Sequence, residues 1–145
     1  MSVLLKLMDQ VPFFWQFTAD EKEVFVENDS FFESYQDGAF IIDEGSTDSS
    51  LCVLVRGDVK VTKKPHINHA LTTMQAGAMF GEISFLTGQE RTSNVIAKGP
   101  VTVFKIDRQS MQQLSLSVQN KIKDQLIEVL VSRLEKMNEK VMKSF

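Results

Sequence analysis

The sequence lacks the features that identify disulfide-stabilised and low-complexity proteins. It contains one cysteine, Cys52, so no disulfide can form within the chain. Cys52 stands in a run of alternating apolar residues, and we expect a buried structural thiol, which a reducing compartment permits. With only 3 prolines and 43% hydrophobic residues, the composition is that of an ordinary globular protein and not of a low-complexity chain.

Long apolar runs and an excess of positive charge are also missing. No run approaches the ~18 apolar residues of a membrane-spanning helix, and the first residues, MSVLLKLMDQV, are not followed by the cleavage site of a secretory signal. We therefore expect a cytoplasmic protein without a membrane partner. The 16 basic and 19 acidic residues give a net charge of −3, which argues against direct binding of nucleic acid.

Signatures of catalysis are absent from the sequence. It shows no Ser-His-Asp set, no Cys-His pair and no Walker loop, so we do not expect an enzyme. His66 and His69 have an HxxH spacing, but no carboxylate or cysteine accompanies them in their predicted turn, and we expect no metal. The polar stretch from Ser46 to Ser50 is expected to be a solvated loop.

Apolar periodicity predicts one domain over residues 1–145, with helices over about 1–29, a β-roll over 30–107 and helices over 108–145. A capping box of Thr18 and Glu21 predicts a helix over Ala19–Asn28, with Val24 and Phe25 facing inward. The fold class is thus mainly β with flanking helices, as an antiparallel β-roll or jelly roll. The predicted strands are Phe31–Tyr35, Ala39–Asp43, Leu51–Arg56, Val59–Lys64, Ala70–Met74, Ser93–Ala97 and Val101–Asp107.

The C-terminal part predicts a short helix that Asp107 caps, and a long helix from about Val118 toward Ser144. The long helix carries apolar residues at alternating spacings of three and four, which is the pattern of a coiled-coil seam. They are Ile127, Leu130, Leu134, Met137 and Val141. This stripe either packs on the chain's own barrel or forms a homodimer through residues 127–141. Apolar residues beside the seam favour a helix that packs one face on the barrel and another face on a partner helix.

The segment 80–97, FGEISFLTGQERTSNVIA, has the composition of an anion site. A helical turn that begins at Glu82 would leave the amides of Ile83 and Ser84 without helical partners, and helix N-termini of this kind bind phosphate. The planar guanidinium of Arg91 suits two phosphate oxygens at once, and Thr92 and Ser93 add hydroxyl groups.

Glu82 is unexpected beside an anion. As an acceptor it would suit a ribose hydroxyl, and together with the phosphate donors it would make a nucleotide pocket. The alternative is a plain turn in which Glu82 forms a salt bridge with Arg91.

The same segment resembles the phosphate-binding cassette of the cyclic nucleotide-binding domain family. The family pattern is Phe-Gly-Glu-apolar-Ala-apolar, a short loop, and Arg-x-Ala-x-Val; the glycines of the β-roll turns and the flanking helices also fit. The matching residues are Phe80, Gly81, Glu82, Ile83, Ser84 and Phe85, and then Arg91, Thr92, Ser93, Asn94 and Val95. Ser84 and Ser93 stand where the family has alanine.

The resemblance implies a role for each part of the segment. The backbone of Ile83 and Ser84 and the side chain of Arg91 would hold a cyclic phosphate, Glu82 would bind the ribose 2′-hydroxyl, and Thr92 would lie near the phosphate and base. The expected ligand site is Phe80, Gly81, Glu82, Ile83, Ser84, Arg91, Thr92 and Ser93. Met137 and Asn138 are weaker candidates for base contacts, because they replace the hydroxyl residues that the family's activators have in the long helix.

By this resemblance the protein is a non-catalytic sensor that signals to an unidentified effector through movement of its C-terminal helix. The ligand is cAMP, or less favourably cGMP, for which a threonine after the cassette arginine is also known in the family. Two alternatives stay open. One is a ligand-free dimerisation module with a degenerate site. The other is the sensor half of a transcription regulator whose DNA-binding domain lies downstream of Phe145.

Overall fold

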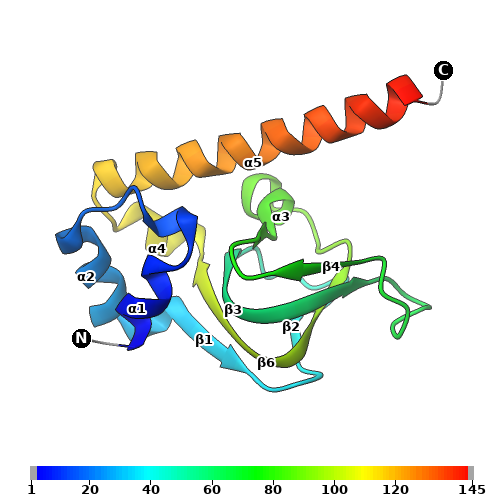
Figure 1. The fold of residues 1–145 in the computed structure, drawn as a ribbon, viewed down its shortest axis with the longest axis horizontal. Coiled ribbons are helices and arrows are strands. Elements are labelled where there is room, and N and C mark those ends of the chain that lie inside the picture. The colour runs from blue at the N-terminus through cyan, green and yellow to red at the C-terminus, as the bar shows by residue number, and fades with distance from the viewer. Residues whose placement is uncertain (1–2, 144–145) are drawn as a thin grey trace.

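A computed structural model describes residues 3–143, and its centre is one antiparallel sheet of six strands (Figure 1). The order is β1-β6-β3-β4, with β2 paired to β6 and β5 paired to β3. The predicted fold class is confirmed: a mainly β roll with flanking helices and a long C-terminal helix. The strands are β1 (Phe32–Tyr35), β2 (Phe40–Ile42), β3 (Leu51–Thr62), β4 (Thr72–Gln75), β5 (Met79–Phe80) and β6 (Asn94–Ile106).

Two long strands, β3 and β6, form the spine of the roll. Each was predicted as two short strands, and that prediction is wrong, because pairing between β3 and β6 continues past the glycines with register shifts around residues 54–58. A Cβ on Gly57 would lie 2.4 Å from the carbonyl oxygen of Pro100, so the two strands approach closely at this point. The two-residue strand β5 was not predicted.

Short helices cover one end of the sheet: α1 (Val3–Asp9), α2 (Ala19–Glu27) and the 3-10 turns η1 (Pro12–Phe14) and η2 (Asp29–Phe31). The capping box of α2 is confirmed. Glu21 N donates to Thr18 Oγ1 at 3.2 Å, and Thr18 N donates to Glu21 Oε1 at 2.8 Å. Phe25 is buried as predicted, but Val24 is 45% exposed. Adjacent helical residues point about 100° apart, so only one of the two faces the core.

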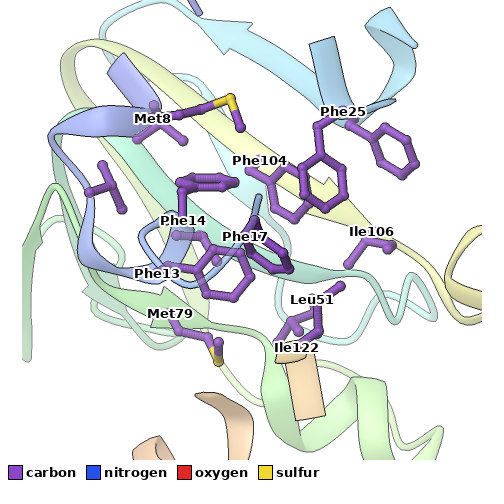
Figure 2. Close-up of a cluster of buried hydrophobic side chains, with 14 of the residues drawn as sticks. Met8, Phe13, Phe14, Phe17, Phe25, Leu51, Met79, Phe104, Ile106 and Ile122 are labelled. Carbon is purple, nitrogen blue, oxygen red and sulfur yellow. The ribbon is translucent and has the colours of Figure 1, made fainter. Parts of the chain in front are cut away.

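The core has two parts. At the helical end, a cluster rich in phenylalanine fills the space between the short helices and β6 (Figure 2). At the other end, residues of β2, β3 and β6 enclose a second cluster that includes Cys52. Burial of Cys52 is as predicted, and it raises the pKa of the thiol to about 12. The buried phenylalanines of the first cluster are Phe13, Phe14, Phe17, Phe25, Phe31, Phe85 and Phe104.

The C-terminal helices are α4 (Arg108–Gln112) and α5 (Leu116–Lys143). Asp107 caps α4 as predicted, accepting a hydrogen bond from Ser110 N at 2.7 Å. The first half of α5 buries Val118, Ile122 and Leu126 against the helical end of the core, whereas residues 131–143 are all exposed. Ser144, the predicted end of the helix, lies outside the described residues.

Of the predicted seam on α5, Leu130 is partly buried on the chain's own core, and Ile127 and Leu134 are 57% and 59% exposed. The stripe therefore packs on the barrel only in part, and its role in a homodimer stays a prediction. None of the helices within residues 3–143 combines the length and the apolar character of a membrane span.

Candidate functional site

Helix α3 (Glu82–Thr87) forms at the predicted position in the segment 80–97. It begins after Gly81, whose φ of 79° is in the left-handed region, and its first intrahelical hydrogen bond runs from Phe85 N to Gly81 O (3.2 Å). The amides of Ile83 and Ser84 precede that bond. Gly88 ends the helix as predicted, with its N–H donating to Ser84 O at 2.8 Å. The turn is thus built to leave its first amides available.

Arg91 is buried, with 4% of its surface exposed. Its Nη1 donates to Gly81 O at 3.0 Å and its Nη2 donates to Ser50 O at 2.7 Å, so the side chain joins the loop before β3 to the start of α3. Its Nε is buried and has no hydrogen-bond partner among residues 3–143. A buried charged donor without a partner is costly and calls for a ligand that would satisfy it.

A cavity of about 340 Å³ lies in front of Arg91. All eight residues of the expected ligand site line this cavity, together with side chains from β2, β3, β4 and β6 and Arg133 from α5. The lining consists of Ile42, Val61, Thr72, Met74, Phe80, Gly81, Glu82, Ile83, Ser84, Arg91, Thr92, Ser93, Val95 and Arg133. The cassette therefore supplies one wall, the sheet supplies another, and the long helix closes one edge.

Glu82 is buried and forms an ion pair with Arg133. Arg133 also donates from Nη2 to Met79 O at 2.9 Å, and burial lowers the pKa of its guanidinium. The alternative interpretation of the segment, a salt bridge between Glu82 and Arg91, is not among the ion pairs of residues 3–143. The carboxylate that the resemblance assigns to the ribose is thus neutralised by the C-terminal helix.

Sequence reasoning missed Arg133. The available signal was its position on α5: it follows Ile122, Leu126 and Val129 at intervals of four, three and four residues, on the face that packs on the barrel. A charged residue continuing a buried apolar stripe indicates a partner of opposite charge below it.

Met137 and Asn138, the weaker candidates, are not among the residues that line the cavity. They lie about one turn beyond Arg133, and Met137 is 61% exposed. Asn138 lies with Glu135 and Glu139 on the exposed end of α5. Contact between these two residues and a ligand in the cavity would require α5 to move.

The loop before β3 takes part in the site, although it was expected to be merely solvated. The carboxylate of Asp48 lies 3.5 Å from Arg91 Nη2 and 3.9 Å from the ammonium of Lys105. Partial burial opposes ionisation of Asp48, but hydrogen bonds from Ser50 and the charges of Lys105 and Arg91 outweigh it and lower the pKa of the carboxyl. Asp48 therefore supplies a counter-charge that orients Arg91.

The family model described as cyclic nucleotide-binding domain matches residues 32–117. The human cyclic nucleotide-gated channel beta-3 is 32% identical over 83 residues, which are 55% of this chain and 10% of the channel. Human cGMP-dependent protein kinase 2 is 34% identical over 85 residues, which are 56% of this chain and 11% of the kinase. The matched region spans only about a tenth of these curated relatives.

A solved structure shares the fold. The crystal structure of a cyclic nucleotide-binding domain from Methylobacillus flagellatus KT superposes with a TM-score of 0.74 at 20% identity, covering 98% of this chain and 82% of that chain. At this identity the likeness concerns the fold.

Proposed function

Because this chain belongs to the cyclic nucleotide-binding domain family, we propose that residues 1–145 act as a single, non-catalytic sensor of cAMP or cGMP. The ligand would occupy the cavity in front of Arg91, and its binding would be transmitted by movement of α5 to an effector. We expect this sensor in the cytoplasm, and we expect that neither a metal nor direct contact with nucleic acid takes part.

The observation that carries the proposal is the state of Arg91. Its two Nη atoms are held by backbone carbonyls, and its Nε is the buried donor that lacks a partner within residues 3–143. An oxygen of a cyclic phosphate would accept from this guanidinium and from the amides of Ile83 and Ser84. Asp48 would hold the guanidinium in place during binding.

Glu82 supports the ribose part of the proposal. A buried carboxylate accepts hydrogen bonds, and a ribose 2′-hydroxyl in the cavity would donate one. Arg133 now occupies the carboxylate, so the ligand has to share Glu82 with Arg133 or displace it. Either outcome changes the contact between α5 and the cassette, which supplies a physical route from the ligand to the helix. The ligand can shift the equilibrium between the two positions of α5 only by the difference between its affinities for them.

Titration calorimetry of the whole chain with cAMP and with cGMP tests the proposal. Arg91→Ala should weaken binding by about 2–5 kcal/mol, or about thirty-fold to several thousand-fold, because it removes one partner of a buried charge pair. Arg56→Ala is the matched control, since Arg56 is exposed on β3 and is not among the residues that line the cavity. Absence of heat with both nucleotides at millimolar concentration, or unchanged affinity in Arg91→Ala, would refute the proposal.

The same titration distinguishes the two bases. The resemblance makes cAMP the first candidate. Two observations favour cGMP: Thr92 lines the cavity, and one relative of the chain is a cGMP-dependent protein kinase. If the Thr92 hydroxyl binds the guanine amino group, Thr92→Ala should weaken the binding of cGMP and leave the affinity for cAMP unchanged. Equal effects on both nucleotides would assign Thr92 to the phosphate.

A further inference from the structure

Two residues that contact the guanidinium of Arg91 lie outside the ligand cavity. Asp48 and Ser50 line a second, polar cavity of about 280 Å³, and within residues 3–143 neither belongs to the lining of the cavity in front of Arg91. Ser50 contacts the guanidinium through its carbonyl oxygen at 2.7 Å, and Asp48 contacts it through its carboxylate at 3.5 Å. A group in the second cavity can therefore influence a ligand through Asp48 without contacting the ligand itself.

Lys105 is the cation of this second cavity. Within residues 3–143 no other lysine or arginine lines it, whereas three carboxylates do, those of Glu33, Asp48 and Asp107. The side chain of Lys105 is only 15% exposed. Its Nζ lies 3.9 Å from Asp48 and 3.5 Å from Glu33, and it donates to the hydroxyl of Tyr35 at 3.3 Å. Burial opposes the charge of the ammonium, but Tyr35 and the other groups around it outweigh burial and raise its pKa, so Lys105 is charged at neutral pH.

Pairing in the sheet places Lys105 between its partners. On one side of β6 it pairs with Cys52 at the start of β3, directly after the loop that carries Asp48. On the other side β1 pairs with β6 and presents Glu33 and Tyr35. Residues that stand opposite each other, or two positions apart, across a pair of strands are neighbours on one face of the sheet. The position of the ammonium is thus fixed by backbone pairing on both sides.

One oxygen of Asp48 is shared between two cations. Its Oδ2 lies 3.5 Å from Nη2 of Arg91 and 3.9 Å from Nζ of Lys105. Charge-assisted hydrogen bonds between such groups are about 2.7–2.9 Å long, so neither contact is a close pair. The side chain of Asp48 is 47% exposed and has room to move. An oxygen that is attracted to both cations is held back from a close pair with Arg91.

We propose that Lys105 is a positioning residue for the ligand: by holding Asp48, it keeps this carboxylate close enough to orient Arg91 and too far away to neutralise it. A carboxylate that closed on the guanidinium would compete with a phosphate for the same charge and would repel the phosphate. The inference rests on the proposed function, since it takes the ligand to be an anion that Arg91 binds. It adds to the site a residue that lies outside both the cassette and the lining of the ligand cavity.

Calorimetry with cAMP and cGMP on the whole chain tests the inference. Lys105→Met should weaken nucleotide binding about three- to tenfold, because Asp48 would then close on Arg91. Lys98→Met is the matched control: it removes the same charge from an exposed position on the same strand, and it should leave the affinity unchanged. Lys105→Arg keeps the charge and should bind like the wild type. Circular dichroism establishes that each variant is folded. Equal losses in Lys105→Met and Lys98→Met would overturn the inference.

A double variant shows whether Lys105 acts through Asp48. In an Asp48→Asn background, Lys105→Met should cause no further loss of affinity, because the carboxylate that it positions is absent. A loss of the same size in both backgrounds would mean that Lys105 acts on the ligand directly through its charge, or on the fold through its packing. Either result would overturn the inference.

NMR of the ligand-free chain gives a measurement that does not depend on nucleotide or on a change at Lys105. Asp48→Asn should shift the Nζ resonance of Lys105 and speed the exchange of its ammonium protons with water. Asp58→Asn, exposed on β3, should do neither. An unchanged resonance in Asp48→Asn would overturn the inference whether or not the chain binds nucleotide. Absence of nucleotide binding in a wild type that shows this contact would refute the proposed function and leave the contact between Lys105 and Asp48 standing.

Discussion

A Cβ atom on Gly81 would lie 2.7 Å from Nη1 of Arg91 and 2.9 Å from the carbonyl oxygen of Ser50. The missing side chain at this position is what allows the guanidinium to approach the backbone at the start of α3. The φ of +79° adds a second requirement for glycine. One residue thus shapes the turn of α3 and the position of the cation beside it.

Gly81→Ala is therefore expected to lower affinity for the nucleotide at least about tenfold, because the methyl group displaces Arg91. Gly88→Ala is the matched control. Gly88 also has a positive φ, +73°, but a Cβ there would meet no atom within 4 Å. Both variants should lose about 1 kcal/mol or more of unfolding free energy through backbone strain, measured by urea denaturation. Calorimetry should find weakened binding only for Gly81→Ala, and equal affinities in the two variants would contradict this role of Gly81.

Whether a residue of the site could be predicted depends on how far it lies from the cassette in the sequence. The eight residues that the sequence proposes from segment 80–97 all line the cavity, because a contiguous motif reveals its own spacing. Their binding role stays a prediction. The residues that hold them, Ser50, Asp48 and Arg133, are separated from the cassette by some 30 to 50 positions, and no local periodicity reports a contact of that kind.

Between elements, Glu21 connects α2 to α5. Its carboxylate accepts a hydrogen bond from Lys121 and another from Ser117 Oγ (3.1 Å), while it also completes the capping box with Thr18. The hydrogen bond from Lys121 and then that from the Thr18 backbone lower the pKa of Glu21 from 4.5 to about 2. An ion pair that persists in mild acid thus joins α2 to α5.

This contact predicts a specific dependence of stability on pH. Because the pKa of Glu21 is lower in the folded state, its contribution is fully present above pH 4.5 and is lost as the pH falls from about 4.5 to about 2. Glu21→Gln should cost about 1 kcal/mol at pH 7, and the difference from the wild type should shrink as the pH falls below 4.5. Urea denaturation at pH 7 and pH 3 measures this. Glu23→Gln, exposed on the same helix, is the control, and a cost for Glu21→Gln that did not change with pH would contradict the prediction.

Helices were easier to predict than strands for a physical reason. Capping signals such as Thr18 with Glu21 and Asp107 act within one turn, so the sequence around them is sufficient. Continuity of β3 and β6 depends on pairing between two segments, which carries both strands through glycines that end strands elsewhere. The same dependence on a distant partner explains why β5 was not predicted.

For the molecule as a whole, α5 is both a part of the core and the element that a ligand would move. Its buried residues attach the helix to the phenylalanine cluster, and Arg133 attaches it to the cassette. Leu126, the last fully buried residue of the helix, lies about two turns before Arg133, so the proposed shift at the cassette would leave the start of the helix anchored.

Hydrogen exchange should detect that shift. Nucleotide is expected to change the exchange of α5 amides around residues 126–136, and Arg133→Ala should abolish most of the change, because it removes the contact for which the ligand competes. Asp124→Ala, exposed on the same helix, is the control. A change of equal size in Arg133→Ala and the wild type would show that the signal does not pass through Arg133.

The two hydrophobic clusters share their strands: β3 supplies Leu51 and Val53 to one and Cys52 and Leu54 to the other. We therefore expect the two clusters to unfold together, because alternate residues of one strand belong to both. Occupancy of the cavity is therefore thermodynamically linked to the entire domain. A nucleotide at a hundred times its dissociation constant would add about 2.7 kcal/mol to the free energy of unfolding. The phenylalanine cluster at the helical end would gain the same stabilisation, although it does not contact the ligand.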